Sequence, residues 1–203
     1  MMLTNKELRI IEIFRKRLFK TYTIREISKA VETTSYSWTF NAVKKLSKLG
    51  ILHLEEKGHS KIVTINLNSA IAIKYLSLLD ELEANEREIP NINEIFKIIN
   101  TAYFTLIIAG SYAKGTETKN SDLDVIVITN DDTISILNTL KNKGGLLIPE
   151  VHPYVFTQKE FLEMLLAKEE NYAKFIFKER LIFFGAENYY LTINEARKHG
   201  FNG

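Results

Sequence analysis

Residues 110–124 constrain the fold of this chain most, because they carry a Gly-Ser pair and an Asp-Leu-Asp triplet between two apolar runs. Each run has the length of a buried strand. Side chains alternate along a strand, so Asp122 and Asp124 are expected to share one face. Two carboxylates beside a turn at Gly110 and Ser111 suit Mg²⁺ and a substrate phosphate. Phosphoryl or nucleotidyl transfer is therefore the chemistry that we expect.

The composition narrows the class of protein. With 203 residues, 45% of them hydrophobic and 26% charged, the chain is typical of a globular protein with room for two small domains. No apolar run approaches the ~20 residues of a membrane-spanning helix. The first residues mix Lys, Arg and Glu with apolar positions, unlike a signal peptide, so we expect a cytoplasmic protein with no membrane partner. The lack of cysteine excludes disulfides, thiolate catalysis and cysteine-based zinc sites.

Basic residues are concentrated near the N-terminus. Residues 1–68 contain 13 Lys and Arg and 6 Glu, a net charge of +7; the whole chain has +2, which leaves −5 for the remainder. A basic module of this kind is compatible with nucleic-acid binding. Scattered lysines on a solvated surface would give the same count.

The first module has the pattern of three helices and a hairpin. Thr4 with Glu7 and Thr23 with Glu26 have the spacing of capping boxes, and a third helix is expected from Ser35 to Gly50. Two alternating runs near 51–55 and 61–67 follow as a hairpin. Over about residues 4–68 this order resembles winged helix-turn-helix DNA-binding domains. The resemblance implies DNA contacts from the third helix and the wing, through Ser37, Asn41, Lys44, Lys45, Lys48, Lys57, His59 and Lys61. A module that only mediates protein contacts or dimerisation is the alternative.

We expect three segments along the chain: a winged helix domain at 1–68, a connecting helix and linker at 69–90, and a second domain at 91–203. Pro90 disfavours helix at the residue before it and marks the boundary. In the second domain, strands alternate with helices, which predicts an α+β fold with a mixed sheet and helices on one side. The expected strands are 103–109, 122–129, 146–156 and 181–185.

The motif at 110–124 resembles the signature of the DNA polymerase β-like nucleotidyltransferase superfamily, and the small size is similar to minimal nucleotidyltransferases. The matching residues are Gly110, Ser111, Lys114, Gly115, Ser121, Asp122 and Asp124. The resemblance implies that the two aspartates hold two divalent ions, Mg²⁺ or alternatively Mn²⁺, and that the Gly-Ser turn seats the triphosphate. It further implies that Lys114 and Ser121 assist nucleotide binding. Backbone N–H groups at such a turn attract phosphate oxygens, which agrees with this role.

That superfamily also uses a third carboxylate from a later strand. Glu150 is the only acid between Leu146 and Phe156, so it is the expected third metal ligand and catalytic residue. His152 lies on the same expected strand face and would take this position if the register differs. Pro149 and Pro153 are unusual in a central strand and predict an edge or a bulge.

Several functions remain open at this point. The first is transfer of a nucleoside monophosphate from an NTP, expected to be ATP, to an acceptor hydroxyl. By resemblance the acceptor is a partner toxin, with the chain acting as its antitoxin and binding its own operator. The second is a DNA-binding regulator whose nucleotidyltransferase fold only senses nucleotide. The third is a small-molecule or RNA nucleotidyltransferase. A homodimer is compatible with each, and the phenylalanines near 175–184 are interpreted as core.

Overall fold

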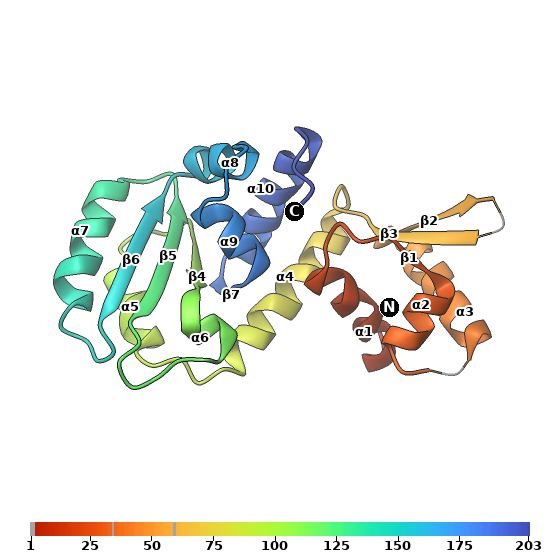
Figure 1. Ribbon diagram of the computed structural model, residues 1–203, viewed down its shortest axis with the longest axis horizontal. Helices are drawn as coiled ribbons and strands as arrows, with labels where there is room; N and C mark the ends of the chain where they lie inside the picture. The colour runs from red at the N-terminus through yellow and green to blue at the C-terminus, as the bar shows by residue number, and fades with distance from the viewer. Residues whose placement is uncertain (1–2, 34, 59) are drawn as a thin grey trace. The chain divides into compact units, whose positions relative to one another are not determined.

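The computed structural model describes residues 3–33, 35–58 and 60–203; His59, expected on the wing, lies outside these ranges. The chain divides into two compact units, Met1–Leu79 and Asp80–Gly203. Each unit contains helices and its own sheet (Figure 1), so the α+β class is confirmed. Within the described residues, no helix combines the length and apolar character that crossing a bilayer would require.

The first unit begins with two helices whose capping boxes form as expected. The hydroxyls of Thr4 and Thr23 accept the backbone N–H groups of Glu7 and Glu26, whose carboxylates accept the threonine N–H groups in return. These caps begin α1 (Asn5–Lys16) and α2 (Ile24–Ala30). The third helix, α3 (Tyr36–Lys48), starts after Ser35 and is followed by Gly50 with a φ of 75°.

A small antiparallel sheet completes this unit. Its strands are β1 (Tyr22–Thr23), β2 (Leu52–Lys57) and β3 (Ser60–Ile65), in the order β1-β3-β2. The core beneath it consists of fully buried side chains from the three helices and the sheet: Ile10, Phe14, Ile27, Val43, Leu46 and Val63. Three helices followed by a hairpin is the expected order, and β1 is an addition to it.

Helix α4 (Ala70–Asn85) continues past Leu79 into the second unit. There Asp80 is buried, accepts a hydrogen bond from the Tyr190 hydroxyl and lies 3.6 Å from an Arg180 nitrogen. Ala84, one helical turn later, is fully buried in the second core. The last part of α4 is thus an integral element of the second unit.

The second sheet has the order β6-β5-β4-β7. Its strands are β4 (Phe104–Ile108), β5 (Leu123–Thr129), β6 (Val151–Phe156) and β7 (Leu181–Phe184). Strand β4 is antiparallel to both of its neighbours, whereas β5 and β6 are parallel, so the sheet is mixed as expected. Strand β6 lies at the edge, which confirms the expectation from Pro149 and Pro153. It also begins later than expected, after Glu150.

Helices cover both faces of this sheet, whereas the sequence led us to expect helices on one face only. Helices α5 (Ile92–Ile98) and α7 (Thr133–Gly144) pack on the face of Leu106 and Val125. Helices α8 (Gln158–Leu166), α9 (Tyr172–Lys178) and α10 (Ala186–Lys198) belong to the other side, where α8 contacts β5 and β6, and α10 contacts β4. The reason is that consecutive residues of β4 and β5 are apolar, so both strand faces require cover. Helix α10 is an element that we did not expect.

Candidate active site

Gly110 and Asp124 are in direct contact at the end of β4. The chain leaves β4 and enters the short helix α6 (Gly110–Lys114). The Ala109 N–H donates to the Asp124 carbonyl at 3.1 Å, which fixes the turn against β5. Gly110 has a φ of 67°, and an added Cβ would lie 2.1 Å from Oδ2 of Asp124. Only glycine therefore fits this turn with the carboxylate in place.

Asp122 and Asp124 flank the first residue of β5 and share one face of the chain. Asp122 is exposed and Asp124 is half-buried. Burial raises the pKa of Asp124 above its ordinary value, and the negative charge of Asp122 adds to this while His152 opposes it. Negative charge is thus crowded at this point. Carboxylate oxygens in such a place have the donor chemistry of a divalent-cation site.

Glu150 and His152 lie differently with respect to Asp124. The parallel register places His152 of β6 opposite Asp124, with 3.8 Å between Nδ1 and Oδ1. Glu150 precedes β6, is exposed, and accepts the Leu123 N–H through its backbone carbonyl at 2.9 Å. In the described part of the chain, no three or more His, Asp or Glu side chains are grouped so that they could hold a metal ion. The structure thus brings His152 beside Asp124, the alternative that the sequence had left open.

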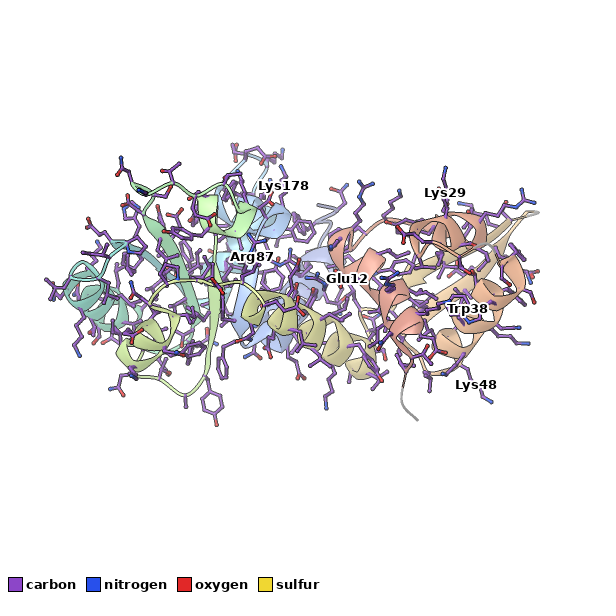
Figure 2. The ribbon with its side chains drawn as sticks, turned by 90° about the horizontal axis from the view of Figure 1, so that it is seen from below. Glu12, Lys29, Trp38, Lys48, Arg87 and Lys178 are labelled. Carbon is purple, nitrogen blue, oxygen red and sulfur yellow. The ribbon has the colours of Figure 1, made fainter. Side chains whose placement is uncertain are left out.

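The remaining motif residues line the loop between β4 and β5. Ser111 lies in the first turn of α6 and is half-buried, whereas Lys114 at its end is exposed. The Ser121 hydroxyl accepts the Thr118 N–H at 2.9 Å, so it closes the turn before Asp122. Arg87, labelled in Figure 2, donates to the Tyr112 carbonyl at 3.3 Å and so supports α6.

Aromatic residues adjoin His152, the neighbour of Asp124. The rings of His152 and Tyr154 lie 5.5 Å apart on β6, and Tyr154 packs on Tyr172 of α9 at 4.4 Å. The Tyr172 hydroxyl is buried and has no hydrogen-bond partner among the residues that the structure describes. Burial raises the pKa of Tyr172, and the charge of Asp124 contributes to the shift. The available sequence signal was the alternation that puts Tyr154 on the face of His152.

In the first unit, the expected DNA-contacting residues have different surroundings. Four of these residues are exposed on one face of α3: Ser37, Asn41, Lys44 and Lys48. Lys45 instead points to the core side, where its ammonium pairs with Glu7 at 2.7 Å. On the hairpin, Lys57 is exposed, while Lys61 lies 3.3 Å from Glu56 and over the Phe40 ring at 4.4 Å.

The structure thus has a Gly-Ser turn against an aspartate pair in a mixed sheet with helices, which agrees with the resemblance to nucleotidyltransferases noted in the sequence. Comparison with protein families agrees: residues 89–184, a little under half of the chain, match the family model of the nucleotidyltransferase domain. The matched region begins shortly after α4 and ends with β7. Comparisons with curated proteins and with solved structures gave no significant match. The match supports an activity of the nucleotidyl-transfer kind and an NTP as the substrate.

Proposed function

We propose that this protein transfers a nucleoside monophosphate from an NTP, specifically ATP, to an acceptor hydroxyl. The contact between Gly110 and the Asp124 carboxylate supports this proposal most, because the turn that we propose for phosphate binding lies beside an acidic pair. The domain that performs the transfer is residues 91–203. The acceptor we favour is a protein side chain, as in an antitoxin that modifies its toxin.

The donor atoms fit a divalent cation bound through Asp122 and Asp124. Mg²⁺ at these carboxylates, with Mn²⁺ as a substitute, would stabilise the negative charge of the transferred group and of the leaving pyrophosphate. Gly110 and Ser111 would orient the triphosphate, and Lys114 would neutralise part of its charge. Ser121 acts by holding the loop before Asp122. Glu150 remains the proposed third carboxylate, in competition with His152.

Pyrophosphate release tests this proposal. The protein is incubated with ATP, Mg²⁺ and candidate protein acceptors, and release is compared with that of Asp122→Asn and Asp124→Asn. We expect each variant to lose at least 100-fold in rate, roughly the range for removing one charge-stabilising group. Glu117→Gln removes an exposed carboxylate from the same loop and serves as the matched control. Equal rates in all four proteins would contradict the proposal.

A second function is supported by the exposed face of α3. We propose that residues 1–68 form a winged helix that binds DNA and that residues 69–90 connect it to the transferase domain. The support is a row of polar and basic side chains on one helical face: Ser37, Asn41, Lys44 and Lys48. Lys57 and Lys61 of the hairpin would add phosphate contacts. A regulator that only senses nucleotide would show the DNA binding without turnover.

A further inference from the structure

Lys114 lies against an aromatic ring of a helix far away in the sequence. Its ammonium nitrogen is 4.9 Å from the centre of the Phe175 ring, within the distance of a cation–π interaction. Lys114 ends α6, the helix that begins at Gly110, whereas Phe175 belongs to α9. Lysine has a long flexible side chain, so this ring limits the positions that the ammonium takes.

The Phe175 ring stacks on Tyr172, which packs in turn on a second tyrosine. Tyr172 stacks on it with 15° between the ring planes and 5.9 Å between the centroids. The two residues are three apart on α9, which places them on one helical face. Tyr172 in turn packs on Tyr154 of β6 at 4.4 Å. The aromatic stack is thus anchored on the edge strand of the sheet, and Phe175 is a fixed surface for Lys114.

The stack also connects Lys114 with the acidic pair. Tyr154 follows His152 by two residues on β6, and His152 faces Asp124 at 3.8 Å. The series therefore runs from the Asp124 carboxylate through His152, Tyr154, Tyr172 and Phe175 to the Lys114 ammonium. Positive charge is held at one end and negative charge at the other.

We propose that Phe175 is a positioning residue, which holds the Lys114 ammonium at the phosphate end of the nucleotide site. This inference rests on the proposed function, because it needs an NTP as the ligand. Phe175 does not touch the nucleotide in this account; it acts through Lys114. The simpler alternative is that Phe175 only fills space between α9 and α6.

A double-mutant cycle distinguishes positioning of Lys114 by Phe175 from simple packing between α9 and α6. Phe175→Leu keeps an apolar side chain but removes the ring, and Phe175→Trp restores a ring. In the otherwise unaltered protein, ATP binding measured by calorimetry should weaken about two- to fivefold in Phe175→Leu, the range of an exposed cation–π contact. Phe175→Trp should bind ATP as the unaltered protein does. In a Lys114→Met background, Phe175→Leu should cause no further loss.

Phe177→Leu is the matched control, since it removes a ring of the same helix that pairs with Phe201. It should leave ATP binding unchanged in both backgrounds. An equal loss from Phe175→Leu with and without Lys114 would overturn the positioning role, and so would unchanged or tighter binding in Phe175→Leu.

An NMR measurement keeps this inference distinguishable from the proposed function. Lysines are ¹³C-methylated, and the Lys114 signal is identified by its loss in Lys114→Met. The ring of Phe175 should shift this signal upfield, and Phe175→Leu should abolish the shift. If the Lys114 signal is ring-shifted but the protein does not bind ATP, the contact with Phe175 exists and the proposed function is contradicted. Normal ATP binding without the ring shift would overturn the positioning of Lys114 by Phe175.

Discussion

The Asp124 carboxylate occupies the space that a side chain at Gly110 would need. An added Cβ would lie 2.1 Å from Oδ2 of Asp124 and 3.2 Å from its Cγ. The turn at Gly110 and the acidic pair are thus one structural unit, which explains why the motif begins with glycine. A change at either residue is expected to affect the other.

Gly110→Ala should therefore lose both activity and stability. The left-handed backbone alone costs roughly 1–2 kcal/mol for a residue with a Cβ, and the displaced carboxylate adds to this. Urea unfolding and pyrophosphate release provide the two measurements. Gly58→Ala is the matched control, because Gly58 has a φ of 61° and no atom of the described residues lies within 4 Å of an added Cβ. Equal effects of the two substitutions would contradict the contact with Asp124.

The side chains at positions 150 and 152 should contribute differently to cation binding. His152 faces Asp124, so His152→Asp would bring a third carboxylate to the pair, and Mg²⁺ prefers oxygen ligands. We expect this variant to bind Mg²⁺ in the presence of ATP several-fold more tightly, roughly a tenfold change at most. Glu150→Gln should reduce the affinity for Mg²⁺ less than Asp124→Asn does. Calorimetric titration of Mg²⁺ decides both points, and tighter binding in Glu150→Gln would contradict the proposed role of Glu150.

Short-range sequence patterns were sufficient to predict most of the helices and strands. The capping boxes at Thr4 and Thr23 depend on residues three apart, and each begins a helix as expected. Helix α10 was missed because it has no side-chain cap and follows Gly185 in a left-handed conformation. Its burial depends on β4, far earlier in the sequence.

Site details that depend on register were harder to predict. The motif lies within residues 110–124, so the turn at Gly110 and Ser111 could be placed beside the two aspartates from the sequence. The choice between Glu150 and His152 required the alignment of β5 with β6, which no local pattern specifies. Lys45 was expected to face outward, yet it pairs with Glu7, 38 residues earlier. Such contacts follow from the packing of α1 against α3.

The pair of Glu7 and Lys45 should stabilise the first unit in a pH-dependent way. Burial raises the pKa of Glu7, but hydrogen bonds from Lys45 and Thr4 outweigh it and hold the pKa below its ordinary value of 4.5. A lowered folded-state pKa stabilises the protein above pH 4.5, and this contribution is lost as the pH falls through the folded-state value. Glu7→Gln should thus lower stability at pH 7 by about 2 kcal/mol.

Urea unfolding at several pH values provides the measurement for Glu7. The difference between Glu7→Gln and the unaltered protein should shrink as the solution becomes more acidic than pH 4.5. Glu56→Gln, which removes an exposed partner of Lys61, should have little effect at any pH. A difference for Glu7→Gln that does not depend on pH would exclude the ion pair as its cause.

DNA binding by the first unit should depend on Lys44 and Lys48 and not on Lys45. Each exposed lysine that contacts a phosphate contributes about one unit to the slope of log affinity against log salt. Lys44→Gln and Lys48→Gln should each reduce this slope in fluorescence anisotropy titrations. Lys45→Gln should lower stability through Glu7 and leave the slope unchanged.

Lys29→Gln is the matched control for DNA binding. Lys29 and Lys48 project from opposite sides of the first unit (Figure 2). Both side chains are exposed, so the two substitutions remove the same charge at similar structural cost. A slope that falls equally in Lys29→Gln and Lys48→Gln would indicate nonspecific attraction instead of recognition by α3.

Transfer of label from ATP shows whether this protein is a nucleotidyltransferase. The protein is incubated with Mg²⁺ and acceptor proteins, once with ATP labelled at the α-phosphate and once with ATP labelled at the γ-phosphate. Nucleotidyl transfer at Asp122 and Asp124 predicts that only the α-label enters the acceptor, and that Asp124→Asn abolishes its transfer while Glu117→Gln does not. Incorporation of the γ-label, or α-label transfer that persists in Asp124→Asn, would contradict it.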